Sequence, residues 1–194
     1  LSEARLEAQI EEIDELNTSG ATNVRVLKGI EADILADGRL DYDAALLDRL
    51  DFVIGSIHGR FSMNREAMTA RVLTAMDDPH LTILAHPTGR LLLSREPYGL
   101  DIDAVLEKAA ASGVAIEINA DPHRLDLDWR HCMRARELGV RIAIGPDAHS
   151  VRSLDYVFAG VGMARKAWLT PADILNTGDA DEVMAFARAR RALA

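Results

Sequence analysis

The sequence contains a single cysteine, no long apolar run and comparatively few basic residues. Cys132 stands alone among 194 residues, so the chain can form no internal disulfide, which is typical of a reducing compartment. No apolar stretch approaches the roughly 20 residues that a membrane-spanning helix needs. The first residues are too acidic for a secretory signal. We therefore expect a cytoplasmic protein without membrane association.

Acidic residues outnumber basic ones by 31 to 22, which gives a formal net charge of -9. A protein that binds nucleic acid nonspecifically needs Lys and Arg to neutralise phosphates, so this balance argues against such a binder acting alone. The Walker phosphate loop, the G-x-G-x-x-G motif and the G-x-S-x-G motif are also absent. What is present suits a folded domain, since 48% of the residues are apolar and 27% are charged.

Short β-rich runs alternate with helical segments along the chain. Strands are expected at residues 24–30, 52–57, 81–85, 114–119 and 140–145. Helices are expected at residues 43–50, 64–75, 101–112 and 128–138, with others near both ends of the chain. This alternation indicates βαβ units and a parallel sheet. No repeat or linker interrupts it, so residues 1–194 are expected to form one α/β domain, either a barrel or an open sheet.

Candidate metal ligands gather where these strands end. Glu31, His58 and His86 come at the ends of the first three strands, and Asp147 and His149 follow the fifth. In parallel α/β folds the active site lies beyond the carboxyl ends of the strands. Because alternate strand residues share a face, several of these side chains can point into one crevice.

Such a cluster of carboxylates would repel itself unless cations lay within it. His together with Asp and Glu suits Zn, Mn or Fe, and two or three such ions can hydrolyse phosphoesters by activating water. In the fourth strand, Glu117 and Asn119 lie opposite the apolar face and could add to the crevice. One histidine after a strand more often caps or packs, but four such strand ends together favour a metal site.

Three arginines near these positions are candidate phosphate clamps. Arg60 follows His58 by two residues, Arg90 follows His86 by four, and Arg124 follows the fourth strand. A guanidinium can bind phosphate through two hydrogen bonds, although any one of these side chains could equally be a solvated loop residue.

The remaining histidines and the cysteine lie outside this pattern. His123 follows the fourth strand and could contact substrate. His80 and His131 are expected at the surface. Cys132 is expected to pack in a helix, since nothing beside it suggests an activated thiolate.

These residues resemble a PHP domain (polymerase and histidinol phosphatase superfamily), and more narrowly the C-terminal PHP domain of bacterial family X DNA polymerases. The resemblance runs from residue 1 to about residue 177. Its most specific stretches are KGIE (28–31), SIH (56–58), ILAHPTGR (83–90), EIN (117–119), RLDL (124–127) and PDAHS (146–150). The family X version is indicated by GVGMAR (160–165), WLT (168–170) and LNT (175–177).

The resemblance implies a distorted (β/α)7 TIM-like barrel with a trinuclear metal centre. Carried over to this sequence, the ligands are Glu31, His58, His86, Asp147 and His149. In the family, Mn commonly supports the activity, and Zn, Fe or Mg are alternatives. The implied chemistry is phosphoester hydrolysis: 3′-5′ exonuclease work on DNA, with AP-endonuclease and 3′-phosphatase activities in some members. DNA and the polymerase domains in cis are the implied partners.

The sequence departs from this family at its start. A PHP domain begins with a strand bearing His-x-His and a nearby Asp, then a second strand ending in Asp-His, and neither is in this chain. We expect a partial barrel lacking its first two strands, a fragment of a longer polymerase with an incomplete metal site. It should bind metal weakly, hydrolyse little and self-associate through an exposed sheet edge.

Two alternative functions remain open. One is a small-molecule phosphatase resembling histidinol-phosphate phosphatase, which would hydrolyse phosphomonoesters but leave 3′-ended DNA intact. The other is a non-catalytic module that stabilises a polymerase. The presence of all five candidate ligands together speaks against the second.

Overall fold

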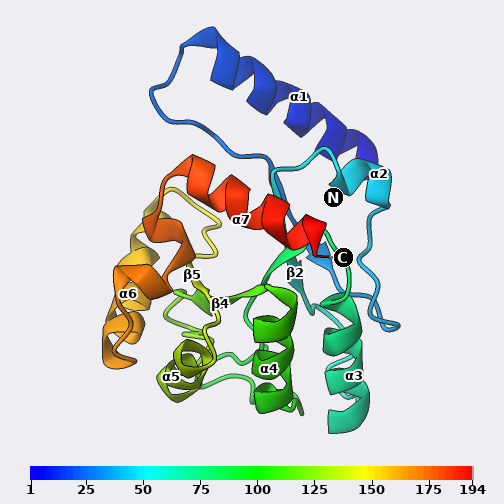
Figure 1. The fold of residues 1–194 in the computed structure, drawn as a ribbon, viewed down its shortest axis with the longest axis vertical. Coiled ribbons are helices and arrows are strands. Elements are labelled where there is room, and N and C mark those ends of the chain that lie inside the picture. The colour runs from blue at the N-terminus through cyan, green and yellow to red at the C-terminus, as the bar shows by residue number, and fades with distance from the viewer. Residues whose placement is uncertain (194) are drawn as a thin grey trace.

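Five parallel strands form the centre of the protein, whose residues 1–193 are described by a computed structural model (Figure 1). The strands are β1 Gly29–Asp33, β2 Phe52–Ser56, β3 Leu81–Leu84, β4 Ala115–Asn119 and β5 Ile142–Gly145. They lie in the order β1-β2-β3-β4-β5, so each strand pairs with the next in sequence. A barrel has this sequential order, whereas doubly wound sheets reverse theirs. The predicted parallel α/β fold is confirmed, and within the described residues β1 and β5 are the sheet edges.

Seven helices accompany the sheet within residues 1–193. They are α1 Glu3–Ser19, α2 Ala44–Leu47, α3 Arg65–Ala75, α4 Ile102–Ser112, α5 Trp129–Glu137, α6 Val157–Lys166 and α7 Ala180–Ala192. Four of the predicted starts are confirmed, because the side chains of Asp43, Asn64, Asp101 and Asp128 each accept a backbone N–H of the first turn. No helix among these residues is long and apolar enough to cross a membrane.

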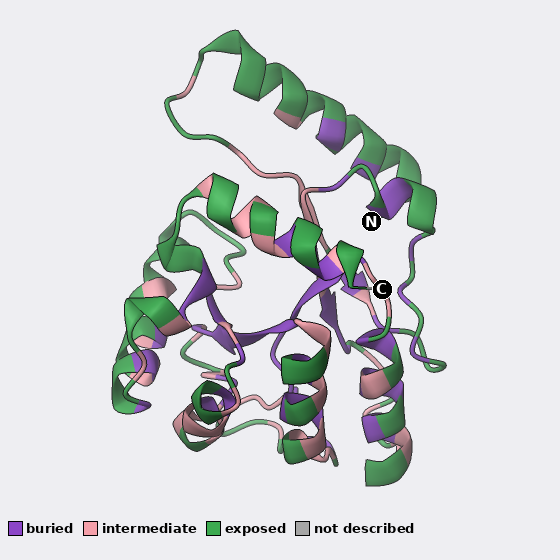
Figure 2. Ribbon diagram, viewed as in Figure 1, coloured by how far each residue is buried: buried purple, intermediate pink, exposed green. Residues whose placement is uncertain are grey.

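The two faces of the sheet bury different amounts of apolar surface. Helices α3 to α6 pack on one face over the larger core cluster, and β3 and β4 are wholly buried, whereas Ala32 is the buried residue of β1 (Figure 2). The other face carries a smaller cluster that includes Ile83, Ala115 and Ala143, against which Val183 and Phe186 of α7 pack. A cavity of about 360 Å³ lies on this face, with Glu117 in its lining.

Two local predictions differ from the structure near the ends of the chain. The first strand begins at Gly29 rather than residue 24, since Val24 is 69% exposed and Val26 instead bonds to the side chain of Asn17. This shift places Glu31 in the middle of β1. Near the other end, where further helix is expected, Thr170 donates to the side chain of Asp173 and opens only a short 3-10 turn, η2 Pro171–Asp173.

The amino edge of the sheet, where the strands begin, is tied to α7. Arg190 donates to the carbonyl of Asp78 at 2.9 Å, and Arg191 donates to that of Leu50 at 2.8 Å. His80 lies at this edge, just before β3. Its expected exposure is wrong, because the residue is only 8% exposed and its ring bonds to two aspartates. His131 is partly exposed on α5.

Candidate metal centre

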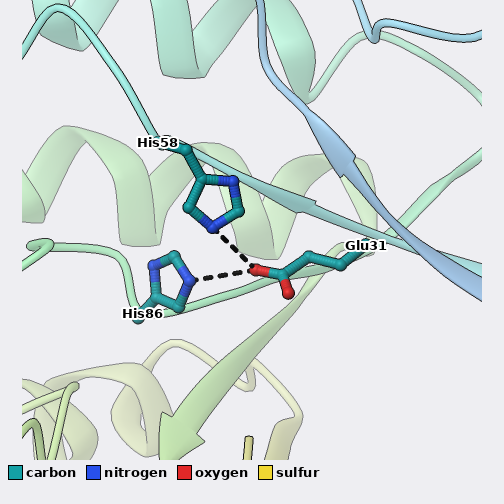
Figure 3. Close-up of side chains that lie close together, drawn as sticks. All are labelled: Glu31, His58 and His86. Carbon is teal, nitrogen blue, oxygen red and sulfur yellow. Dashed lines mark hydrogen bonds and ion pairs between the residues drawn. The ribbon is translucent and has the colours of Figure 1, made fainter. Parts of the chain in front are cut away.

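Glu31 of β1 lies beside His58 and His86, which follow the carboxyl ends of β2 and β3 (Figure 3). The Nε2 atom of His86 lies 3.0 Å from Oε1 of Glu31, and Nε2 of His58 lies 3.4 Å from the same oxygen. One potential ligand atom from each residue lies within 4.8 Å of the other two. These are three of the five predicted ligands.

The cluster is buried on one side and open on the other. The His86 side chain is 2% exposed, whereas those of Glu31 and His58 are 35% and 46% exposed. An ion or substrate could therefore approach from the side of Glu31 and His58 while His86 forms the floor.

Asp33 is a member of this site that the sequence reasoning missed. Its Oδ1 lies 2.5 Å from Nδ1 of His58. A carboxylate on one ring nitrogen fixes the orientation of a metal-binding histidine and directs the other nitrogen to the ion. The signal was available, since Asp33 follows Glu31 by two residues and so shares its face of β1.

The electrostatics of the cluster favour positive charge. Hydrogen bonds to Glu31 and then to Asp33 raise the pKa of His58 to about 9. The hydrogen bonds from His58 and His86 hold the pKa of Glu31 well below its usual range. Without a metal ion, a proton on His58 balances part of the carboxylate charge, so a divalent cation would take over that role.

Strand β4 supplies no residue to the cluster, but its Glu117 binds the backbone of His86. Oε2 of Glu117 accepts the backbone N–H of His86 at 2.8 Å, and burial raises the pKa of Glu117 to about 8. His86 has a φ of 28°, which is rare for a residue other than glycine and is typical of functional sites. A Cβ atom on Gly145 would lie 2.4 Å from Oε1 of Glu117, so a side chain there would displace the Glu117 carboxyl group.

Asp147 and His149 are placed apart from this cluster. Nδ2 of Asn119 donates a hydrogen bond to Oδ2 of Asp147 at 3.0 Å, and Nε of Arg124 lies 3.5 Å from the same oxygen. The His149 side chain is 87% exposed, and its Nδ1 lies 2.8 Å from the carbonyl oxygen of Asp147. The contribution of these two residues to a shared metal centre stays a prediction.

The three predicted phosphate-binding arginines differ in their surroundings. Arg60 is exposed just beyond His58. Arg90 donates to the backbone carbonyls of Arg124 and Leu125, which shows that it holds the loop after β4. Arg124 faces Asp147, and its buried Nη1 has no hydrogen-bond partner among the described residues.

His123, the histidine expected to contact substrate, is exposed in the same loop as Arg124. Its Nδ1 lies 2.8 Å from Oδ1 of Asp121. The ring therefore lies at the surface and contacts a residue of the same loop.

The residues present fit a divalent transition metal. Two imidazoles and a carboxylate form a donor set that Zn, Mn and Fe accept. Nδ1 of His86 is buried without a hydrogen-bond partner among the described residues, so this ring is positioned by packing and by Glu31. Fold and site together define an α/β chain with a candidate metal centre at the carboxyl edge of a sequentially ordered parallel sheet.

Comparison with known proteins gives relatives of two kinds. The chain is 45% identical to "DNA polymerase/3'-5' exonuclease PolX" of Bacillus subtilis over 96% of its own length and 32% of that protein. It is 35% identical to a probable phosphatase of Caldanaerobacter subterraneus over 65% of its length and 51% of that protein. A probable phosphatase of Thermoanaerobacter is 31% identical over 79% of the chain and 64% of that protein. The chain thus spans only part of each relative, and no protein-family profile matches it.

Proposed function

We propose that this chain is the metal-dependent phosphoesterase part of a family X-type DNA polymerase, a PHP domain that processes the 3′ ends of DNA. The observation that carries the proposal is the cluster of Glu31, His58 and His86 at the carboxyl edge of the sheet. The identity to a polymerase with 3′-5′ exonuclease activity over 96% of the chain supports DNA as the substrate.

Each residue of the cluster has a distinct task in this function. Glu31 and the Nε2 atoms of His58 and His86 would hold the metal, and Asp33 keeps His58 turned toward it. A bound divalent ion supplies Lewis-acid chemistry and lowers the pKa of water. The open side at Glu31 and His58 admits the phosphate group, while the buried His86 excludes solvent from below.

The other predicted residues would extend the centre toward the substrate. Asp147 and His149 would contribute further ligands to a trinuclear site, with Mn as the first candidate and Zn, Fe or Mg as alternatives. Arg124 lies against Asp147, which would place its guanidinium beside a bound phosphate. Arg60 would meet the substrate from the exposed side of His58, and Arg90 would act mainly by holding the loop that carries Arg124.

Phosphatase activity on small phosphomonoesters is the second candidate function. The observation that favours it is the identity to probable phosphatases over 65% and 79% of the chain. The two functions differ in what the site must admit, since a DNA 3′ end is a diester within a long polyanion. Because the chain has an overall charge of -9, DNA binding would require other domains to contact the DNA backbone.

The experiment that tests the proposal measures Mn²⁺ binding and hydrolysis with the purified chain. Substrates are 3′-ended single-stranded DNA, bis-p-nitrophenyl phosphate as a diester and p-nitrophenyl phosphate as a monoester. We expect Mn-dependent cleavage of DNA and of the diester, even if turnover is slow. Glu31→Gln should reduce both binding and cleavage, whereas Glu11→Gln, on the exposed face of α1, should change neither.

The outcomes separate the candidates. Mn-dependent hydrolysis of the monoester alone would establish the phosphatase alternative. Absence of Mn²⁺ binding, or hydrolysis that Glu31→Gln leaves intact, would overturn the proposed centre.

A further inference from the structure

Arg71 of α3 is a buried cation that binds backbone carbonyls. The residue is 6% exposed. Its Nε lies 2.8 Å from the carbonyl oxygen of Leu35, its Nη1 lies 3.0 Å from that of Gly59, and its Nη2 donates to Ile34. Nη1 also lies 3.6 Å from the sulfur of Met63. One guanidinium therefore joins the chain segments that leave β1 and β2.

Those segments carry the groups that orient the candidate metal site. Ile34 directly follows Asp33, and Gly59 directly follows His58. The guanidinium bridges the two segments one residue beyond the Asp33–His58 contact of 2.5 Å. A change in the separation of these segments would therefore move the His58 ring relative to both Asp33 and Glu31.

Close packing limits where the segment after β1 can lie. Gly38 has a φ of +88°, and a Cβ atom there would lie 2.8 Å from the carbonyl oxygen of Arg71 and 2.6 Å from Cβ of Thr74. The loop thus rests directly on α3, so the reach of the Arg71 side chain sets the position of the Ile34 and Leu35 carbonyls. A guanidinium suits this task because its donors are arranged in a rigid plane.

We infer that Arg71 is a positioning residue of the metal centre, fixing the carboxyl ends of β1 and β2 so that His58 meets Asp33 and Glu31. The inference rests on the proposed metal-binding function. Arg71 itself contacts neither the substrate nor the ion. It acts through the backbone next to Asp33 and His58.

The chain offers a matched control in Arg190 of α7. Arg190 is 3% exposed and donates to the carbonyls of Met76 and Asp78, at 2.6 and 2.9 Å. It therefore performs the same kind of backbone binding as Arg71, but at the amino edge of the sheet. Arg71→Met and Arg190→Met remove equivalent buried guanidinium groups from opposite edges.

The test is a calorimetric titration of the 194-residue chain and its variants with Mn²⁺, after thermal unfolding has shown that each variant folds. Arg71→Met should weaken Mn²⁺ binding by about 10-fold or more, the range for loss of an outer partner of a metal site. Arg190→Met, remote from the centre, should stay within about twofold of the parent. Arg71→Lys, with a single ammonium, should bind Mn²⁺ at an intermediate strength and carries the comparison if Arg71→Met does not fold.

A second readout works without metal. In ¹H–¹³C spectra of the metal-free protein, Arg71→Met should move the imidazole resonance of His58, and Arg190→Met should leave it in place. Unchanged His58 resonances in Arg71→Met would overturn the inference, as would equal loss of Mn²⁺ affinity in both methionine variants. If the parent chain bound no Mn²⁺, the proposed function would fail, and the His58 resonance would still decide the positioning role of Arg71.

Discussion

His80 and His86 lie at opposite ends of β3 and are both buried, at 8% and 2% exposure, but their rings differ in hydrogen bonding. Both ring nitrogens of His80 are bonded, Nδ1 to Asp78 at 2.9 Å and Nε2 to Asp48 at 3.0 Å. His86 has only Glu31 at its Nε2, and its Nδ1 has no partner among the described residues. The protein therefore satisfies both ring nitrogens of His80, whereas it leaves one nitrogen of His86 without a hydrogen bond among the described residues.

The same contrast extends along the two edges of the sheet. At the amino edge, Arg190 and Arg191 bind backbone carbonyls and so join α7 to the chain that enters β2 and β3. At the carboxyl edge, His86 and Asp147 have positive φ values, and Glu117 is buried with a raised pKa. Backbone strain and the burial of a carboxyl group cost stability, and such features persist where function requires them. Contacts at the amino edge stabilise the fold, whereas the carboxyl edge carries the candidate metal centre.

The largest effect should appear when each of the two histidines is replaced by alanine in turn. His86→Ala removes a candidate ligand, so Mn²⁺ binding and diester hydrolysis should fall by more than the roughly 10–100-fold that loss of an outer partner costs. His80→Ala should leave both unchanged. Titration calorimetry and initial rates on bis-p-nitrophenyl phosphate would measure this, and full activity of His86→Ala would erase the distinction between the two edges.

A smaller effect on the same edge should follow Asp33→Asn. Asparagine keeps the size of the side chain but loses the charge that holds His58 by its Nδ1, so Mn²⁺ affinity should fall by about 10-fold. Asp37→Asn is the control, because Asp37 is an exposed residue that pairs with Arg39. A drop in affinity of the same size in both variants would mean that overall charge, rather than the Asp33–His58 contact, attracts the ion.

Sequence alone predicted what depends on local rules. Helix starts at Asn64 and Asp101 follow from a side chain capping its own first turn, and the proximity of Glu31, His58 and His86 follows from their placement on adjacent parallel strands. These features need only the nearest residues or the general geometry of parallel sheets.

Prediction failed where the partner is distant in sequence. His80 was expected at the surface because Asp48, which binds it, lies 32 residues away. Nothing in the sequence around Arg90 indicated that its guanidinium donates to carbonyls 34 and 35 residues further along the chain. The contacts of Asp147 with Asn119 and Arg124 likewise join residues distant in sequence, which no local pattern encodes, and its role as a ligand stays a prediction.

At the amino edge, His80→Ala should cost stability alone. It removes two hydrogen bonds to aspartates, one of which, Asp48, is 68% exposed and can be hydrated again. We expect a loss of about 1 kcal/mol in the free energy of unfolding. Urea denaturation would measure it, with Mn²⁺ titration as the second readout. Weakened Mn²⁺ binding without loss of stability would contradict the assignment of the two edges.

The smallest effect concerns Cys132 of α5, which lies behind the loop that leaves the carboxyl end of β4. The residue is fully buried, its Sγ lies 3.7 Å from the carbonyl oxygen of Leu127, and burial raises the pKa of its thiol to about 12. A raised pKa means that the unfolded thiol ionises first, so this group lowers stability only as the pH rises above its ordinary value of 9.0 toward 12. Between pH 7 and 8, alkylation of the native protein by iodoacetamide should therefore be limited by unfolding and should accelerate in urea. Rapid labelling without urea would mean that nearness to the carboxyl edge, and not burial, sets the reactivity of the side chains there.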